Sequence, residues 1–222
     1  MKTTPYVLTA VMALLCLACS DGAYEKGDTV YSYMQADFVE AYVGSDRQVD
    51  SVLTDDGDRL LLTEAYSASW MQRPDTVYRA VLYYNKVEGK AQVVNMQKLS
   101  TVSIRKAAAY AKGVKTDPLT LESVWLSGHR RFLNMSVIVK TGAIGEDAQI
   151  QTMGMVGDSI VADDSGRRIC RLQLYHNQGD VPQYYSQRVY FSVVLDGLEA
   201  DSLHLSVNTY DGMVTRDFSL SR

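Results

Sequence analysis

The chain has 222 residues, of which 46% are hydrophobic and 22% are charged, a composition typical of globular proteins and too apolar for general disorder. Its formal net charge of −4 and isoelectric point near 5.4 exclude a strongly basic surface, whereas nucleic-acid binding depends on Lys and Arg that neutralise phosphates. We therefore expect no nucleic-acid partner. The length allows one large or two small domains.

The first residues have the layout of an export signal. Lys2 supplies a positive start, and the run from Val7 to Ala18 carries no charge. This run is too short to cross a bilayer, because a spanning helix takes about 20 apolar residues whereas signal-peptide cores take roughly 7 to 15. We therefore predict a signal peptide at residues 1–18 and a mature chain without a membrane span.

Two of the three cysteines lie in the stretch LLCLACSDG, at the end of this apolar run. Small Ala18 before Cys19, with apolar Leu17 before it, resembles a bacterial lipobox, although Cys16 stands where Leu is most common. The resemblance implies cleavage after Ala18, lipidation of Cys19 with several acyl chains such as palmitate, and a tether over residues 19–27. Several chains hold a protein on a membrane where one holds it weakly. The alternatives are a plain secretory signal and a buried amino-terminal helix with packing cysteines.

Residues 28–111 are expected to form a first β-domain. Alternation of apolar and polar residues with a period of two, closed by turn pairs, predicts strands rather than helices. The expected strands are residues 29–43, the two arms of RQVDSVLTDDGDRLLLT around Asp56 and Gly57, DTVYRAVLYYNKV, and QVVNMQKLSTVSI. Glu88, Gly89 and Lys90 join the last two strands. Five strands with the loop YSASWMQRPD after the third are typical of a small OB-type barrel.

A linker at residues 112–118, broken by glycine and proline, precedes a second domain at residues 118–222. Strand patterns resume there, and the final hairpin turns at Asp211 and Gly212. Alternation predicts two inward apolar stripes: Leu133, Met135, Val137 and Val139 in RFLNMSVIVKTG, and Val189, Phe191, Val193 and Leu195 in SQRVYFSVVL. About six or seven strands in this length predict an antiparallel β-sandwich. In RRICRLQLYH the alternation points Cys170 to the apolar face, so we expect a buried structural thiol.

The assembled pattern resembles the NigD-like lipoproteins of Bacteroidetes. It combines the lipobox, an OB-like domain with DDGDRLLLT, and a second domain that opens with DPLTLESVWLSGHRRFLNMSVIVKTG. Its most specific part is the acidic-Pro pair followed by Trp125, Gly128, Leu133 and Asn134. The resemblance covers nearly all of the mature chain and implies an OB-fold followed by a β-sandwich in a lipid-anchored envelope protein. It carries over no reaction, ligand or functional residue.

The residues after the lipidated cysteine bear on location. Asp21 and Glu25 resemble a Bacteroidetes surface-export tag, without the denser acid cluster of that tag. The expected location is the bacterial outer membrane, with the lipid on Cys19 as the anchor. Its periplasmic and surface faces both stay open.

One pair of motifs points to a hydrolase. GDSI at residues 157–160 and DSLH at residues 201–204 match the blocks that hold the Ser nucleophile and its His base in GDSL-type hydrolases. That fold needs the serine between a parallel strand and a helix, whereas SIVADDSG leads into another strand and His204 alternates with leucines on an outer face. We therefore expect no enzymatic activity and no catalytic residue.

Metal and cofactor sites are not expected either. His129, His176 and His204 are far apart in the sequence, without a second His or Cys at ligand spacing. The turns DDGD at 55–58 and DDSG at 163–166 lack the alternating carboxylates and distal Glu of a calcium loop, so hairpin turns account for both. Calcium at one of these turns stays open as the alternative.

Tyrosine is common, with 15 Tyr against 4 Phe and 2 Trp, and most of these rings suit half-buried strand positions. Trp70 with Tyr66, and Tyr184 with Tyr185, lie outside the regular patterns and are candidates for stacking on a ligand such as a sugar. Two hypotheses follow. The first is a non-catalytic interaction module that contacts an envelope protein. The alternative is a glycan-binding accessory lipoprotein that uses these loop aromatics.

Overall fold

The computed structural model describes residues 33–143, 150–157 and 159–221. The predicted signal peptide at 1–18, the tether at 19–27 and Cys19 lie outside this part of the chain. No helix among the described residues is long and apolar enough to cross a membrane. Strands supply almost all of the regular structure, which confirms the all-β prediction.

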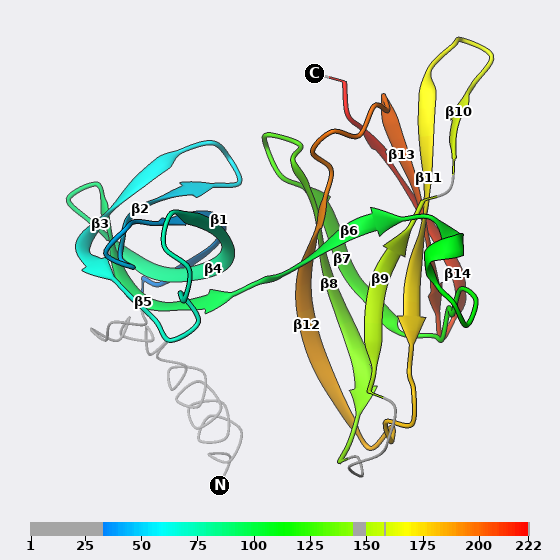
Figure 1. Ribbon diagram of the computed structural model, residues 1–222, viewed down its shortest axis with the longest axis horizontal. Helices are drawn as coiled ribbons and strands as arrows, with labels where there is room; N and C mark the ends of the chain where they lie inside the picture. The colour runs from blue at the N-terminus through cyan, green and yellow to red at the C-terminus, as the bar shows by residue number, and fades with distance from the viewer. Residues whose placement is uncertain (1–32, 144–149, 158, 222) are drawn as a thin grey trace, which may run out of the picture.

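The first domain is a closed barrel of five strands (Figure 1). Its strands are β1 (Gln35–Val43), β2 (Val49–Thr54), β3 (Arg59–Tyr66), β4 (Thr76–Val87) and β5 (Lys90–Lys98). They pair in the order β1-β2-β3-β5-β4, and β1 closes the barrel against β4. This confirms the predicted five-stranded barrel of the OB type.

Strand alternation fills the barrel. In β1, Val39, Ala41 and Val43 are buried while Tyr42 is exposed, because successive side chains of a strand point to opposite faces. Gly57 and Gly89 occupy the tight turns after β2 and β4 with φ of 102° and 78°, a region that favours glycine. The predicted hairpin turns at these glycines are therefore confirmed.

The second domain is one sheet of nine strands around a single core. Its strands are β6 (Ser100–Arg105), β7 (Thr120–Leu126), β8 (Phe132–Thr141), β9 (Thr152–Val156), β10 (Ile160–Ala162), β11 (Arg168–Asn177), β12 (Tyr185–Val194), β13 (Ser202–Thr209) and β14 (Gly212–Ser219). They pair in the order β14-β13-β11-β9-β6-β12-β8-β7, and β10 pairs with β11 beside this path. A bridge between Leu119 and Thr209 joins the β7 and β13 sides, so the sheet curls round on itself.

The predicted apolar stripes supply the core of this domain. Met135 of β8, Phe191 of β12 and Leu205 of β13 are almost fully buried and belong to one cluster. Cys170 of β11 joins the same cluster, as its alternation predicts. Burial raises the pKa of the Cys170 thiol, which keeps it protonated and unreactive.

The sequence pattern places β6 in the wrong sheet. The run at residues 92–104 is one predicted barrel strand, but the barrel ends at Lys98 and β6 pairs in parallel with β12 and β9 of the second sheet. The two sheets therefore divide at buried Leu99, earlier than the expected linker at 112–118. That segment follows a short 3-10 helix, η1 (Ala107–Ala109), and Thr116 bridges to His176 of β11.

The second sheet also departs from the predicted antiparallel sandwich. Three of its ladders are parallel: β11 with β13, β12 with β6, and β6 with β9. Two parallel strands cannot be joined by a tight hairpin and need a longer crossover connection. One of the extra strands is β6, which the sequence pattern assigns to the barrel. The sheet therefore holds more strands than the sequence predicts.

Candidate functional site

The first pair of predicted ligand-binding residues packs on the barrel. Tyr66 ends β3 and Trp70 lies in the following loop, and both are partly buried against the barrel core. The Trp70 ring meets the Tyr78 ring edge-on at 5.5 Å. The Tyr78 hydroxyl accepts a hydrogen bond from the Arg73 backbone N–H at 3.1 Å, which holds the loop in place. Both rings therefore pack against the barrel, and their contact with a ligand stays a prediction.

The second pair lies on the other domain. Tyr185 begins β12 and Tyr184 precedes it; they are 68% and 78% exposed, and their rings meet edge-on with centroids 6.5 Å apart. The structure therefore brings together each sequence-adjacent pair but places the two pairs on different domains.

The hydrolase motifs do not form a serine and base pair. Ser159 and His204 border one pocket of about 370 Å³, but they lie on opposite sides of β11. Two strand spacings separate them by roughly 9–10 Å, with Arg171 in between. His204 Nδ1 is instead 2.7 Å from Asp217 Oδ1 on β14. Direct proton transfer from Ser159 to His204 is too far in this arrangement.

The second acidic turn is closed by its own chain. Asp163 accepts hydrogen bonds from the Ser165 backbone N–H and hydroxyl and from the Arg167 backbone N–H, at 2.6–2.9 Å. These bonds hold the pKa of Asp163 at about 2, the Ser165 hydroxyl having the largest effect. No group of three or more His, Cys, Asp or Glu side chains in the described residues is arranged to hold a metal ion.

The first acidic turn carries a buried ion pair within the barrel, at its contact with the second domain, that the sequence reasoning missed. Asp55 Oδ1 lies 2.5 Å from Nη2 of Arg79, a barrel residue whose side chain is only 3% exposed. Asp55 Oδ2 accepts a hydrogen bond at 2.6 Å from Asn134 Nδ2 on β8 of the second sheet. Arg79 also donates to Asn134 Oδ1 at 3.2 Å and to Ser192 Oγ at 3.3 Å. We call Asp55, Arg79, Asn134 and Ser192 the interface cluster.

Because the interface cluster is buried, loss of one of its charged side chains should destabilise the protein. Desolvation is the largest effect on Arg79 and lowers its pKa, while the carboxylate of Asp55 opposes that shift. The guanidinium carbon lies 4.2 Å from the ring centroid of Phe132, which gives the cation a second contact. Removal of the carboxylate would leave a buried cation without its counter-charge.

Aromatic rings and close backbone contacts complete the domain interface. Phe38 of β1 lies 5.2 Å from Trp125 of β7 and 5.8 Å from Tyr190 of β12. The Gly128 N–H donates to the Asp55 carbonyl at 2.7 Å, and a Cβ on Gly128 would lie 2.6 Å from that oxygen. The residues that carry the family resemblance, among them Trp125, Gly128 and Asn134, therefore meet at this interface.

A groove on the outer barrel wall lies beside the interface. It has a volume of about 490 Å³ and is lined by Glu40, Tyr42, Ser51, Val52, Leu53, Arg59, Val77 and Arg131. We call it the barrel groove. Tyr42 of β1 stands directly opposite Val77 of β4, and these side chains are 53% and 54% exposed. Large apolar side chains at this exposure on adjacent strands form a patch suited to contact with another molecule.

Two arginines border the barrel groove. Arg59 donates to Ser51 Oγ at 3.0 and 3.1 Å and has no acidic partner among the described residues. Arg131 belongs to the second domain, where its guanidinium bonds Glu40 at 2.8 Å and Asp196 at 2.9 Å. The hydrogen bonds that Arg131 donates to Asp196 raise the pKa of Arg131. Both domains therefore contribute to one groove, with a fixed cation from the second.

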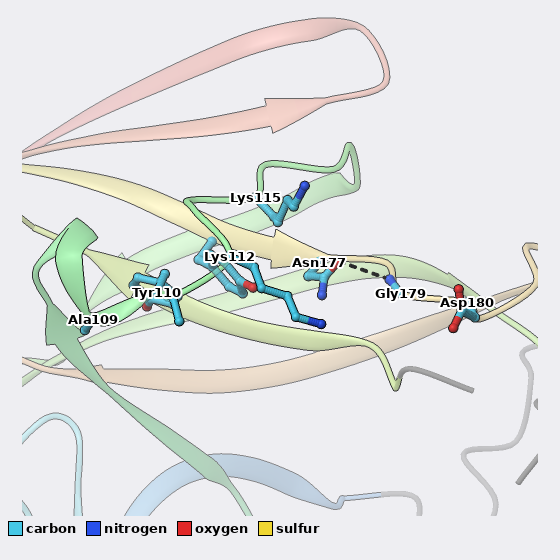
Figure 2. A pocket seen from close by; sticks show the side chains of 9 residues that line it. Ala109, Tyr110, Lys112, Lys115, Asn177, Gly179 and Asp180 are labelled. Atoms are coloured by element: carbon cyan, nitrogen blue, oxygen red, sulfur yellow. Dashed lines mark hydrogen bonds between the residues drawn. The ribbon is translucent and has the colours of Figure 1, made fainter. Parts of the chain in front are cut away.

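A further pocket of about 500 Å³ lies on the second domain (Figure 2). Tyr110 and Lys112 border it from the segment after η1, and Asn177 and Asp180 border it from the end of β11. Tyr175 of β11 stacks on Tyr110. We call it the tyrosine pocket.

Comparisons with known proteins identify solved structures with a similar fold. No family model matches the sequence, and no curated protein matches it. Three crystal structures share the fold over most of their length. A NigD-like immunity protein from Bacteroides caccae is 23% identical, with a TM-score of 0.63 over 84% of this chain and 97% of that one.

The other two structures agree with the first. A protein described as toxin related from Parabacteroides distasonis is 18% identical, with a TM-score of 0.66 over 85% of this chain and 93% of that one. A protein of unknown function from Bacteroides vulgatus is 14% identical, with a TM-score of 0.65 over 85% and 92%. The resemblance found in the sequence is thus confirmed at the level of the fold: the chain has the two-domain all-β fold of a NigD-like protein.

Proposed function

We propose that this protein is a non-catalytic interaction module of the cell envelope, anchored by lipid on Cys19, that binds a partner protein in the barrel groove. The observation that carries the proposal is the exposed pair of Tyr42 and Val77 beside Arg59, a cation without an acidic partner among the described residues. An apolar patch next to an arginine suits a partner that presents an apolar side chain beside a carboxylate.

The rigid domain interface supports this role. Arg131 reaches the groove from the second domain and is held by carboxylates of both domains, Glu40 and Asp196. The buried ion pair of Arg79 and Asp55 lies at the same interface. A groove built from two fixed domains loses little conformational freedom when it binds, which favours affinity.

The fold neighbours support the proposal only by analogy. One is described as an immunity protein and another as toxin related. Because one fold can serve many functions, the argument for this chain depends on the chemistry of the barrel groove.

A photo-crosslinking residue at Val77 should capture the partner in intact envelopes. The matched control is Val87, the same residue type on the same strand and 42% exposed, but outside the groove. We expect a discrete protein adduct from position 77 and none from position 87, measured by mass spectrometry after denaturing purification. Arg59→Glu should weaken the adduct about tenfold or more, because it puts a repulsive charge at the rim.

Equal adducts from positions 77 and 87, or an adduct that survives Arg59→Glu unchanged, would contradict the proposed groove. Recovery of polysaccharide without protein would support the glycan-binding hypothesis instead. In that case the exposed pair of Tyr184 and Tyr185 is the first surface to vary.

The anchor is tested separately. Cys19→Ala should move the protein from the membrane to the soluble fraction, because the lipid is the proposed attachment and no helix among the described residues can span a bilayer. Detergent phase partitioning of envelopes measures this shift. If the Cys19→Ala protein stayed in the detergent phase, the anchor would lie elsewhere.

A further inference from the structure

The tyrosine pocket combines an aromatic surface with cationic side chains. The rings of Tyr110 and Tyr175 stack with centroids 4.2 Å apart and planes inclined at 24°. Tyr110 lies over Gly154, where a Cβ would come within 2.7 Å of the tyrosine hydroxyl. The absence of a side chain at Gly154 thus lets the ring lie close to the sheet, so the stack is part of a rigid surface.

The segment that carries Tyr110 is fixed by its backbone. The Tyr110 N–H donates to the Ala107 carbonyl at 3.0 Å, and the Gly113 N–H donates to the Tyr110 carbonyl at 2.8 Å. Farther along, the His176 N–H donates to the Lys115 carbonyl at 3.0 Å, which ties the segment to β11. A ligand would therefore meet a pre-formed wall, which lowers the entropic cost of binding.

Two lysines near the stack make no ion pair with any residue that the structure describes. Lys112 and Lys115 line the pocket and make no ion pair or hydrogen bond through their side chains. The chain as a whole has a net charge of −4, so two lysines that make no ion pair in one pocket differ from the acidic character of the rest of the protein. One carboxylate, Asp180, borders the same pocket.

A neutral donor lies beside one of these lysines. Asn177 Oδ1 accepts a hydrogen bond from the Gly179 N–H at 3.3 Å, which leaves the Asn177 amide N–H groups available. Figure 2 shows Lys112 and Asn177 pointing to the same side of the pocket, whereas Lys115 points away from them. Lys112 and Asn177 can thus donate to one carboxylate.

From this geometry we infer that the tyrosine pocket binds a carboxylate-bearing saccharide, such as a uronic acid unit. The tyrosine stack offers an apolar face for a sugar ring, and Lys112 and Asn177 take the carboxylate. The pocket volume of about 500 Å³ suits a small ligand. This site goes beyond the proposed protein-binding groove, which lies on the barrel wall and shares none of its lining residues.

The test measures binding of trigalacturonate, triglucuronate and trimannuronate to the full protein by calorimetry at fixed salt. Each ligand is paired with its methyl ester, which keeps the ring and removes the charge. We expect at least one acid to bind, and its ester to bind about tenfold or more weakly, because a charge-assisted hydrogen bond is lost. Inorganic phosphate should not compete at equal concentration.

Substitutions in the tyrosine pocket test whether the ligand binds there. Lys112→Gln and Asn177→Asp should each weaken binding of the acid about tenfold or more, since the first removes the cation and the second repels the carboxylate. Lys90→Gln, an exposed lysine on the barrel, is the matched control and should leave binding unchanged. Tyr175→Val keeps a strand-forming residue but removes the stack, and should also weaken binding; thermal unfolding shows whether each variant is folded.

Three results would overturn the inference. These are no binding of any of the three acids, equal binding of acid and ester, or equal loss of binding with Lys90→Gln and Lys112→Gln. Crosslinking through Val77 should be unaffected by Lys112→Gln, so failure of this site and failure of the barrel groove are distinguishable.

Discussion

Asp55→Ala is expected to lower the free energy of unfolding by about 3–5 kcal/mol, because it leaves the Arg79 guanidinium buried without its counter-charge. Arg79 has a relative exposure of 5%, and Asn134 and Ser192, which share the interface cluster, are fully buried. The Asn134 amide would also lose the acceptor of its 2.6 Å hydrogen bond. Urea denaturation followed by tryptophan fluorescence measures the change.

Two variants separate the charge from other effects. Asp56→Ala removes the neighbouring acid of the same hairpin, which is exposed and has no partner among the described residues, and should cost less than about 0.5 kcal/mol. Asp55→Asn keeps an acceptor of the same shape without the charge, so its cost should fall between the two alanine variants. A loss from Asp55→Ala no larger than that from Asp56→Ala would show that the ion pair does not stabilise the interface.

Removal of a large side chain from either core should destabilise the whole molecule. Leu82 fills the barrel and Phe191 fills the second sheet, with relative exposures of 0% and 1%. Leu82→Ala should cost about 2–5 kcal/mol and Phe191→Ala about 3–5 kcal/mol, since each leaves a cavity in a packed core. Because hydrogen bonds of Arg79 and Asp55 and aromatic contacts of Phe38 join the domains, we expect one unfolding transition that both variants shift.

Calorimetry and denaturant titration with two spectroscopic probes test this coupling. The surface variant Val87→Ala should leave the transition within about 0.5 kcal/mol of its original position. Two separate transitions, of which Leu82→Ala lowers one and Phe191→Ala lowers the other, would contradict the coupling and show that the domains unfold independently.

The coupling matters for the proposed function because the barrel groove takes Arg131 from the second domain. Asp55→Ala removes the acceptor of the hydrogen bond from Asn134 and leaves Arg79 without its counter-charge, which weakens the contacts between the domains. Arg131 would then be held less firmly beside Tyr42 and Val77. Interface variants such as Asp55→Ala should therefore also be examined for the Val77 crosslink.

Local sequence patterns determined the strands, the hairpin turns and the two cores. Period-two alternation depends only on which face of a strand each side chain takes, so it predicted the buried stripe of β8 and the inward position of Cys170. Gly57, Gly89 and Gly212 marked tight turns because positive φ is costly for other residues. The resemblance to NigD-like proteins, which depends on short motifs along the whole chain, was confirmed for the fold.

Only the tertiary structure decided which strands pair and which polar residues meet. Alternation is the same for a strand of either sheet, so nothing local assigned β6 to the second domain or made its ladders parallel. Asp55 and Arg79 are 24 residues apart and meet because the barrel strands close on one another. Arg79 and Ser192 are 113 residues apart, and their contact follows from the docking of two domains. The sequence pattern assigned Asp55 only to a hairpin turn, because its partners are distant in the sequence. The stack of Tyr110 on Tyr175 depends likewise on where the crossover segment lies on the sheet.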